Sequence, residues 1–363
     1  MFSGSYLDTD VEFLLEKVEV QELSLEEKEY LIQSGKKHYS EIISTEYEPS
    51  KEYLAIFYQA VENNSLKFAK DIFTLAKKIS LEKDFVLVSL ARAGIPVGVL
   101  LKRVLEIFFN INTKHYGVSI IRDKGLDTTA IKYILESNPN KKLIFIDGWT
   151  GKGIISKELA KSINDFNKKY KTNISSDLYV VSDISGKAYF SASYEDYLIP
   201  SAVLNSTISG LISRTILNTE KNSFHACKYY EHLKEKDLSL WFIDKIINEI
   251  KKYVLSENID IMSDLQIIQK NIKKEDLVKI SETFIAKIMQ DLKISNINYI
   301  KPGIGETTRV LLRRIPEVIF IKDVNSLETK HLVLLSKEKS VKIIEEKEMP
   351  YKAVGIIYRL KEN

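Results

Sequence analysis

The sequence contains a single cysteine, Cys227, among 363 residues. One thiol cannot form an internal disulfide framework or a zinc site built from several cysteines, and it suits a reducing cytoplasm. Long apolar runs are also missing, since no stretch approaches the roughly 18 uncharged residues of a membrane span. Residues 1–15 lack the basic segment and apolar core of a signal peptide. We therefore expect a cytoplasmic protein without a membrane partner.

Charge of one sign is equally scarce. The 53 Lys and Arg residues are nearly balanced by 50 Asp and Glu residues, which leaves a formal net charge of +3. This balance does not identify a nucleic-acid-binding protein, so any prediction of RNA binding must rest on local basic patches. The length is sufficient for two or three domains that each bury a core.

The hydrophobic pattern changes along the chain. Residues 1–80 have a helical period and are rich in Tyr and Glu, which predicts an N-terminal hood. Between residues 85 and 215, short apolar runs alternate with turns and helix-like stretches, a pattern typical of a parallel sheet built from βα units. Residues 224–292 are helical in period and charged, which indicates a connector. The remaining residues combine one amphipathic helix with strand-like runs, as expected for a small α/β module.

The first candidate site lies in the segment FVLVSLARAGIPVGVLLKR. A buried strand ends at Ser89, and a turn leads into a helix near Pro96. Ligands of open α/β sheets bind beyond the carboxyl ends of the strands, where small residues let backbone N–H groups approach an anion. Arg92 adds a permanent charge with fork geometry. The turn, which consists of Ala91, Arg92, Ala93 and Gly94, fits a diphosphate, although an ordinary strand-to-helix turn with a surface arginine fits the same pattern.

The second candidate site lies in KLIFIDGWTGKGIISKELA. Four apolar residues lead into Asp147, whose carboxylate can accept hydrogen bonds from two ribose hydroxyls or orient a hydrated Mg²⁺. The loop that follows contains Thr150, Gly151, Lys152 and Gly153, and its main-chain amides can wrap a phosphate. The segment is not a Walker A loop, because Ile146 and Gly153 occupy positions that this motif reserves for Gly and for Ser or Thr.

These two loops together resemble the type I phosphoribosyltransferase fold. More closely, the whole chain resembles a predicted phosphoribosyltransferase family encoded beside tellurite-resistance and stress operons, whose members carry a C-terminal Pelota-type RNA-binding domain and are also labelled StiP-like cysteine proteases. The segments that carry the resemblance include FSGSYLDTDVEFLL, GKKHYSEII, SLARAGIPVGVLLKR, HYGVSIIRDKGLD, FIDGWTGKG, EDYLIPSAVLNSTISGLISRT and KPGIGETTRVLLRR.

The resemblance implies roles for these residues. Asp147 would hold the ribose hydroxyls and Mg²⁺, and residues 150–153 would bind the 5′-phosphate of phosphoribosyl pyrophosphate. Arg92 and its turn would bind the pyrophosphate, and the segment containing Arg122 and Asp123 would close over this leaving group. Most members of the type I fold have two adjacent acids at this strand end, whereas Gly148 follows Asp147 here. This departure puts the usual metal and ribose geometry in doubt.

A third candidate site lies in GIGETTR, which leads into the basic run VLLRR. It resembles the Gly-x-Asn-Glu-x-x-Lys signature of Pelota-like domains that grip kinked RNA, with Gly305 in place of the asparagine. Glu306 can accept a hydrogen bond from a guanine edge, and the cationic side chains can contact phosphates. The predicted RNA-binding residues are Lys301, Gly303, Glu306, Arg309, Arg313 and Arg314. A solvated basic helix face is the alternative interpretation.

Three other patterns leave their roles open. Cys227 lies two residues from His225, but a cysteine nucleophile needs a base that is close in space, and sequence neighbours on a strand usually point apart. His38 and His115 are candidates for an acceptor pocket, or polar residues with a structural role. Residues 195–215 fit either a tight helix against the sheet or a loop facing a substrate.

The sequence thus predicts a type I phosphoribosyltransferase-like, Rossmann-like α/β domain with its hood at residues 1–222, a helical connector at 223–292 and a Pelota-like α/β domain at 293–363. The predicted reaction is displacement of pyrophosphate from phosphoribosyl pyrophosphate by an unidentified base-like acceptor, with Mg²⁺, to make or salvage a nucleoside-like stress metabolite. The C-terminal domain is predicted to bind structured RNA. The competing hypotheses are a non-catalytic nucleotide sensor that binds RNA and, third, a cysteine peptidase.

Overall fold

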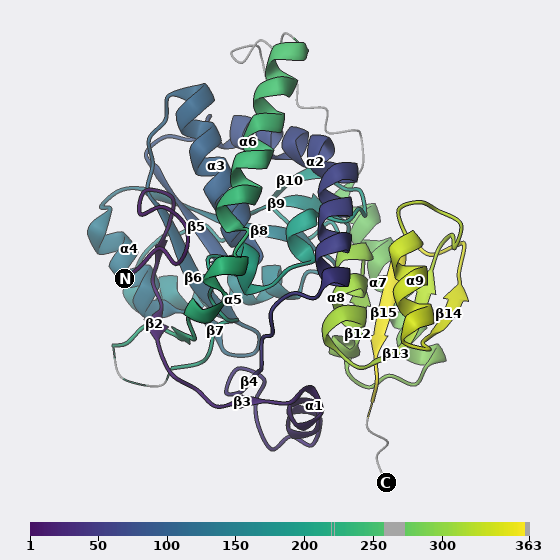
Figure 1. Ribbon diagram of the computed structural model, residues 1–363. Coiled ribbons are helices and arrows are strands. Elements are labelled where there is room, and N and C mark those ends of the chain that lie inside the picture. Colours follow the sequence, from purple (N-terminus) through teal and green to yellow (C-terminus); the bar gives the residue numbers. More distant parts are fainter. Residues whose placement is uncertain (219, 221, 258–272, 360–363) are drawn as a thin grey trace.

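The computed structural model describes residues 1–218, 220, 222–257 and 273–359, and its larger part is built on one central sheet (Figure 1). The strand order is β1-β6-β5-β8-β9-β10, every neighbouring pair on this path is parallel, and the short β7 pairs antiparallel with β6. The strands are β1 (Glu12–Phe13), β5 (Phe85–Ala91), β6 (His115–Ile121), β7 (Gly125–Leu126), β8 (Lys142–Thr150), β9 (Leu178–Asp183) and β10 (Phe190–Ser193). The predicted α/β class with a parallel, Rossmann-like sheet is confirmed.

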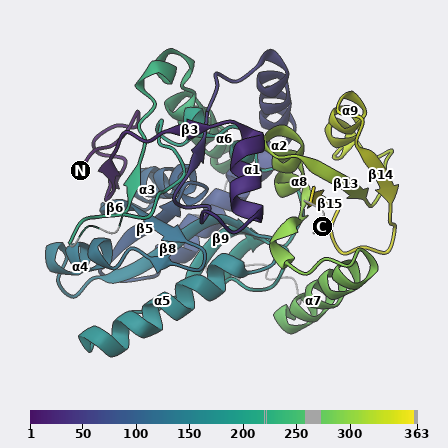
Figure 2. The same ribbon diagram turned by 90° about the horizontal axis from the view of Figure 1, so that it is seen from below.

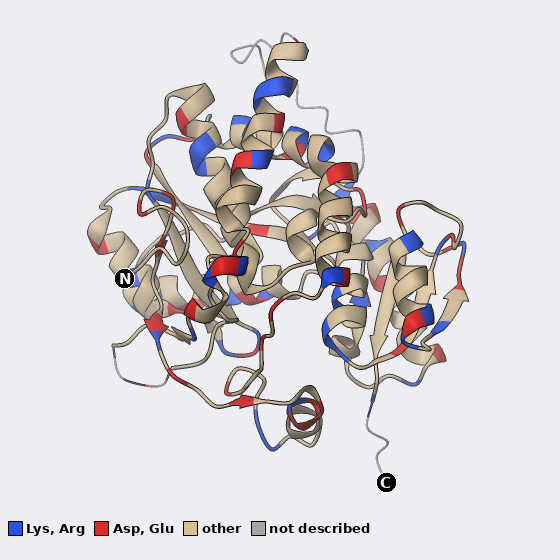
Figure 3. Ribbon diagram, viewed as in Figure 1, with Lys and Arg blue, Asp and Glu red and all other residues tan. Residues whose placement is uncertain are grey.

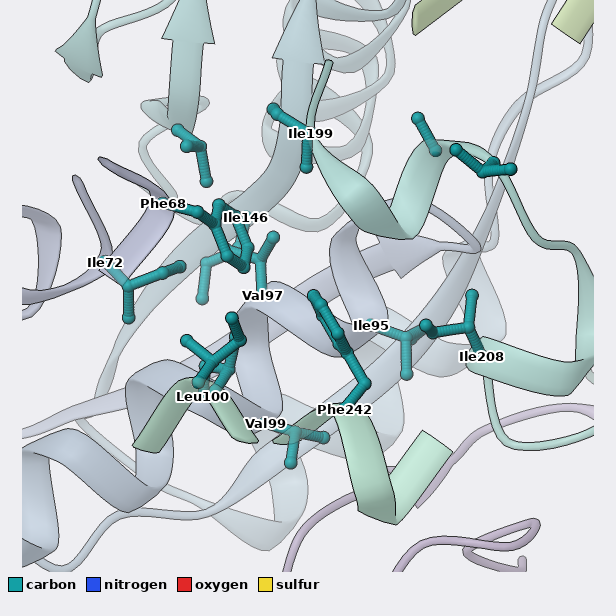
Figure 4. Close-up of a cluster of buried hydrophobic side chains, with 14 of the residues drawn as sticks. Phe68, Ile72, Ile95, Val97, Val99, Leu100, Ile146, Ile199, Ile208 and Phe242 are labelled. Carbon is teal, nitrogen blue, oxygen red and sulfur yellow. The ribbon is translucent and has the colours of Figure 1, made fainter. Parts of the chain in front are cut away.

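Helices cover both faces of this sheet (Figure 2). One face packs against α2 (Lys51–Ile79), α3 (Gly94–Phe109) and α6 (Ser239–Ser256), and the other against α4 (Thr128–Ser137) and α5 (Ile154–Tyr170). The central strands are apolar along nearly their whole length because both of their faces are covered. Figure 4 shows the first of these two cores, where Phe68 of α2 and Phe242 of α6 lie close to Leu100 of α3.

The N-terminal region serves more than one purpose. Within residues 1–80, β1 extends the sheet and α2 belongs to its helical layer, so only the segment between them corresponds to the predicted hood. This segment contains β2 (Glu16–Lys17), β3 (Glu22–Leu23), α1 (Leu25–Gln33) and β4 (Ile43–Ser44). The first turn of α1 is stabilised by a capping box in which Ser24 and Glu27 exchange side-chain to backbone hydrogen bonds.

The predicted connector is divided between the two parts of the molecule. It begins with the short strand β11 (Ala226–Cys227), which pairs with β2 although the pattern indicated only helices there. After the 3-10 helix η3 (Glu231–Lys236), α6 packs into the core of the larger part. In contrast, α7 (Lys274–Asp291) packs against the C-terminal sheet. The connector therefore supplies one helix to each part, and its exact limits stay a prediction.

The C-terminal part is a four-stranded sheet in the order β12-β15-β13-β14. Its elements are η4 (Ile297–Tyr299), β12 (Ile300–Pro302), α8 (Ile304–Arg313), β13 (Pro316–Ile321), α9 (Lys330–Glu338), β14 (Lys342–Glu345) and β15 (Ala353–Ile357). Only β13 and β14 are parallel to each other. Helices α8 and α9 pack on one face and α7 packs on the other, which gives the small α/β module that the sequence predicts.

Asp196 joins the two parts. Its buried carboxylate accepts hydrogen bonds from the backbone N–H groups of Ile304, at 2.8 Å, and Lys352, also at 2.8 Å. Ile304 is the first residue of α8, so a carboxylate from the larger part satisfies a free N–H group at this helix terminus. None of the helices in the described part of the chain is long and apolar enough to cross a membrane.

Candidate functional site

A cavity of about 390 Å³ lies at the carboxyl ends of β5, β6 and β8, where the C-terminal part meets the larger part. Parallel strands end at one edge of the sheet, so residues distant in sequence converge there. Six of its described lining residues are Lys or Arg, namely Arg92, Arg122, Lys152, Arg214, Lys301 and Arg309. Two are acidic, namely Asp147 and Glu306. The cavity is therefore a site with an excess of positive charge, and it suits an anion.

A second cavity, of about 650 Å³, adjoins the first and lies beneath the hood. Arg92, Arg214, Lys301, Glu306 and Arg309 line both cavities. The second cavity is also lined by residues of β4, the start of α2, the C-terminal half of α8 and α1, so it extends the first toward α1. We call the two cavities together the interdomain cleft.

Asp147 lines the cavity as predicted, but it lies within β8, because the strand continues through Trp149 to Thr150. Its carboxylate accepts a hydrogen bond from the Gly148 N–H at 2.8 Å. Burial raises the pKa of Asp147 to about 7, against the opposing effect of the Arg309 charge. A Mg²⁺ ion at Asp147 would meet two carboxylates, those of Asp147 and Glu306, among six Lys and Arg side chains, and no cluster of three or more His, Cys, Asp or Glu residues that could hold a metal occurs among the described residues. The described residues therefore form no metal site by themselves, and the Mg²⁺ stays a prediction.

The turn around Arg92 also lies at the cavity, but its arginine already has partners. The guanidinium pairs with Glu46 of the hood at 3.1 Å and donates to the Asn205 side chain and to the Ile212 carbonyl. Ala91 and Ala93 line the cavity. Gly94 does not, because it is buried against β8, where an added Cβ would lie 2.4 Å from the Ile146 carbonyl oxygen. Its lack of a side chain serves the packing of α3 on the sheet.

The predicted phosphate loop at residues 150–153 is turned toward the C-terminal part. Lys152 donates to the carbonyls of Ile297 and Ile300, and the Gly151 carbonyl accepts a hydrogen bond from Tyr351 at 3.0 Å. Gly153 adopts a φ of 76° immediately before α5, a backbone conformation that favours glycine. Burial, followed by the charge of Lys301, lowers the pKa of Lys152 to about 6. The loop therefore packs against the C-terminal part, and together they line one side of the first cavity.

Arg122 and Asp123 separate in the structure. Arg122 lines the cavity and lies over the Tyr39 ring, 4.5 Å from its centroid. Asp123 points to solvent with 65% of its side chain exposed, is paired only with Arg122 among the described residues, and does not line the cavity. The same ring of Tyr39 also faces Arg214, which donates to the Tyr39 and Ile42 carbonyls. Burial lowers the pKa of Arg214 to about 10.

The Pelota-like signature faces the cleft. Glu306 pairs with Arg309 at 3.1 Å, and both line the first cavity with Lys301. Although burial raises the pKa of Glu306, the charges of Arg309 and Lys301 outweigh this effect and lower it. Gly303 packs against Asp196 with a φ of 96°. Figure 3 shows Lys and Arg on α8 at the junction of the two parts of the molecule.

The last two predicted RNA-binding residues lie in the second cavity. Arg314 pairs with Glu29 of α1 at 2.6 Å, and Arg313 donates to the Val203 carbonyl. Burial, together with the charge of Arg309, lowers the pKa of Arg313 to about 9. The solvated basic helix face that served as the alternative interpretation is therefore wrong for α8.

Cys227 does not line either cavity of the cleft. It is fully buried in the main hydrophobic core on β11, and burial raises the pKa of its thiol to about 12. His225 makes hydrogen bonds elsewhere, through Nδ1 to the Ser119 hydroxyl at 2.8 Å and through its backbone N–H to Asp127. No described residue lining the first cavity is Cys, His or Ser. The arrangement holds no assembled thiol and imidazole pair.

The two histidines proposed for an acceptor pocket, His115 and His38, have structural contacts. His115 is buried between the Asp10 carbonyl and the Ser89 hydroxyl, and burial lowers its pKa to about 4. His38 contacts Ser40 and does not line the described cavities. Residues 195–215 form loops and the short 3-10 helices η1 (Pro200–Ala202) and η2 (Ser206–Ile208), not a long helix.

Among the cleft residues that sequence reasoning missed are Tyr39, Glu46, Trp149 and Arg214. The sequence offered a signal for Arg214 alone, because this arginine stands near the end of the segment 195–215, which is rich in small polar residues. The contacts of Tyr39 and Glu46 depend on how the hood crosses the cleft, which no local pattern encodes.

Residues 4–247 match the family described as tellurite-like stress resistance cysteine protease StiP. The chain belongs to the StiP family. A relative from Acinetobacter baylyi (strain ATCC 33305 / BD413 / ADP1), named Cysteine protease StiP, is 37% identical over 375 residues, which cover 99% of this chain and 95% of that protein. Residues 279–359 match the PELOTA RNA binding domain, so the predicted family and its C-terminal domain are confirmed.

The predicted phosphoribosyltransferase activity is wrong. The StiP family and the relative from Acinetobacter baylyi are both named as cysteine proteases, and nothing supports phosphoribosyl pyrophosphate or a base-like acceptor as partners. The peptidase, the third of our hypotheses, is favoured instead. A solved structure from Neisseria gonorrhoeae, described as a hypothetical protein with bound ppGpp, is 15% identical with a TM-score of 0.25, covering 36% of this chain and 80% of that chain. A TM-score this low supports no conclusion here.

Proposed function

We propose that the protein is a cysteine peptidase of stress resistance that carries an RNA-binding module. The supporting observation is its relation, at 37% identity over 99% of the chain, to a protein named as a cysteine protease. The match of residues 279–359 to the PELOTA RNA binding domain supports the second activity. Because the chain has one thiol, Cys227 must be the nucleophile.

This assignment sets a structural condition. The thiolate, not the thiol, attacks a peptide carbonyl, yet Cys227 is buried and its pKa is raised to about 12. The described conformation is therefore a resting state. Activity requires β11 to separate from β2, so that the thiol reaches both a base and a substrate. The base then takes the thiol proton, sulfur adds to the carbonyl carbon, the amine leaves with a proton, and water hydrolyses the thioester.

The test combines proteolysis with thiol labelling. Full-length protein is incubated with an unfolded protein substrate and with a thiol-directed irreversible peptidase inhibitor, in the presence and absence of RNA. We expect cleavage that depends on Cys227, stops after labelling, and disappears in Cys227→Ser while the thermal melt of that variant stays close to that of the wild type. Cleavage that survives in Cys227→Ser would exclude the cysteine mechanism.

A second candidate function is binding of a phosphate-bearing small ligand in the interdomain cleft, as in the nucleotide-sensor hypothesis. Its supporting observation is the six Lys and Arg side chains around the first cavity. The loops after β5, β6 and β8 line this one cavity, and we propose ligand binding there without phosphoribosyl transfer. Calorimetry with pyrophosphate tests it, because Arg92→Gln should weaken binding at least tenfold, whereas the exposed Lys168→Gln should not. Absence of binding to the wild type would exclude this function.

A further inference from the structure

The Pelota-like signature lies beside the larger part, and its side chains are only partly exposed to solvent. Helix α8 begins against Asp196 of the larger part, and Arg314 near its end is paired with Glu29 of the hood. Between these points, Glu306 and Arg309 line the same cavity as Asp147. Any RNA that reaches these signature residues must therefore enter the cleft and pass next to the larger part.

Both walls of the cleft supply groups that suit a phosphate backbone. The larger part contributes Arg122 and Arg214, and the C-terminal part contributes Lys301 and Arg309. Across the described residues, the Lys301 ammonium has no hydrogen bond or ion pair. The guanidinium of Arg214 contacts only carbonyl oxygens there. Neither cation makes a salt bridge to a carboxylate among the described residues, although the charge of Glu306 acts on Lys301 and that of Glu29 on Arg214. A passing phosphodiester would supply a direct ionic partner to both.

The cleft also provides aromatic rings. Trp149, next to the phosphate loop, lies under Arg309, whose guanidinium carbon is 5.9 Å from its ring centroid. Tyr39 lies under Arg122 and Arg214. Tyr47 lines the second cavity with 77% of its surface exposed. Bases of single-stranded nucleic acid stack on such rings, and alternation of rings with cations matches a strand better than an isolated anion.

Size and continuity favour a strand over one nucleotide. The cavities of about 390 and 650 Å³ adjoin and share residues of both parts, so the cleft continues from Asp147 to the hood. Two hood carboxylates, Glu46 on Arg92 and Glu29 on Arg314, now neutralise arginines along this path. Phosphates of an entering strand would replace them in the same ion pairs.

We propose that both parts of the molecule form one binding site for a single strand of RNA, which lies in the interdomain cleft and contacts Arg122 and Arg214 as well as the Pelota-like signature. The proposal rests on the RNA binding proposed above for residues 279–359 and extends it to the larger part. It is independent of the peptidase chemistry, since Cys227 lies outside the described lining of the cleft.

The experiment measures binding of a fluorescent ten-nucleotide single-stranded RNA to the full-length protein by anisotropy at several salt concentrations. Arg122→Gln tests the larger part and Arg309→Gln tests the signature. Lys168→Gln on α5 and Lys342→Gln on β14 are matched controls, because both side chains are exposed and lie outside the cleft. We expect each cleft variant to bind at least tenfold more weakly and to lower the salt slope by about one unit, and the controls to bind as the wild type.

A second measurement avoids dependence on the folding of any variant. RNA containing photoactivatable 4-thiouridine is cross-linked to the wild type, and the modified peptides are identified by mass spectrometry. We expect cross-links to Trp149 or Tyr39 in addition to residues of the C-terminal part. Cross-links on both walls support the proposal even where a substitution unfolds the protein.

The outcomes separate this proposal from the one on which it rests. If Arg309→Gln weakens binding but Arg122→Gln does not, and cross-links occur only after residue 279, the larger part does not bind RNA and the proposal is overturned while the RNA-binding module stands. If the wild type binds no RNA, both fail. If pyrophosphate displaces the RNA completely at an equal concentration, the cleft is a small-ligand site and the proposal is overturned.

Discussion

The interdomain cleft holds charged side chains around a cavity, whereas Cys227 is fully buried in the hydrophobic core. Lys301 and Arg214 lie in the cleft without carboxylate partners among the described residues, and their pKa values are lowered mainly by burial. The Cys227 thiol is surrounded by apolar side chains, and its pKa is raised by the same physical cause. Burial thus leaves cations in the cleft that a bound anion would stabilise, whereas it keeps the Cys227 thiol protonated and unreactive. The site that the geometry presents and the residue that the family name requires are different places.

The sharpest way to break this comparison is to measure the reactivity of Cys227. A pKa raised from 9.0 to about 12 leaves roughly a thousandfold less thiolate near neutral pH, and burial limits access further. We expect alkylation by iodoacetamide at pH 8 to be at least a thousandfold slower in the native protein than in urea. Native labelling within tenfold of the unfolded rate would show that the thiol is readily exposed and that the two sites differ less than the structure indicates.

The next largest effect concerns the contact that closes the cleft. Asp196→Ala removes two hydrogen bonds to a carboxylate, from the Ile304 and Lys352 N–H groups, each worth roughly 1.5–3 kcal/mol. We expect α8 to be destabilised by about 2–4 kcal/mol, with faster amide exchange at residues 304–308. Hydrogen exchange with mass spectrometry checks this, and the exposed Asp165→Asn is the control. Unchanged exchange would show that Asp196 does not hold the two parts together.

A pH-dependent effect is expected at Asp147. Its pKa is raised to about 7, so the folded state binds the proton more tightly than the unfolded state, and wild-type stability falls as pH rises from about 4 to 7. The Asp147→Asn variant has no carboxyl group to ionise at this position, so it does not lose this stability as the pH rises. We expect the variant to match the wild type near pH 4 and to be more stable by about 1–3 kcal/mol above pH 7, after allowance for partial exposure. Thermal melts from pH 4 to 8.5 would contradict this if the difference were constant.

The smallest expected effect concerns the competition between a hood carboxylate and a bound phosphate for an arginine of the cleft. Glu46→Gln keeps the size of the side chain but removes the negative charge that now pairs with Arg92. We expect the variant to bind pyrophosphate or RNA about two- to tenfold more tightly, because the entering phosphate no longer competes with a carboxylate. Anisotropy with Glu62→Gln, an exposed residue of α2, as the control checks the direction. Weaker binding would show that Glu46 positions Arg92 and does not compete with the ligand.

Local patterns were sufficient for the class of fold. Continuous apolar runs such as FVLVSLA and HYGVSII indicate strands that are buried on both faces, and they form β5 and β6 of the parallel sheet. The rule that ligand sites lie beyond the carboxyl ends of such strands placed Asp147 and Arg92 at one cavity. The same rule could not separate a residue that lines the cavity from one such as Gly94, which serves packing against Ile146.

The function was the weakest inference. The predicted phosphate-binding loops lie beside one cavity. One fold supports many reactions, however, so the resemblance of these loops to those of another family did not identify the reaction. The family match favours a cysteine peptidase, and the one thiol of the chain is the only residue that can carry that chemistry. The burial of Cys227 depends on the pairing of β11 with β2, which lies near the N-terminus of the chain. These two strands are far apart in the sequence, so no local spacing reveals their contact.

The sequence by itself determined the α/β class, the family, the C-terminal Pelota-like module and the residues at the strand ends, because all of these are encoded by periodicity and short motifs. Only the tertiary structure decided that the RNA-binding signature faces the larger part. That orientation depends on single long-range contacts, such as Asp196 with the start of α8 and Glu29 with Arg314. Hydrogen bonds and ion pairs between distant segments leave no periodic trace in a sequence, since either partner alone looks like an ordinary surface charge.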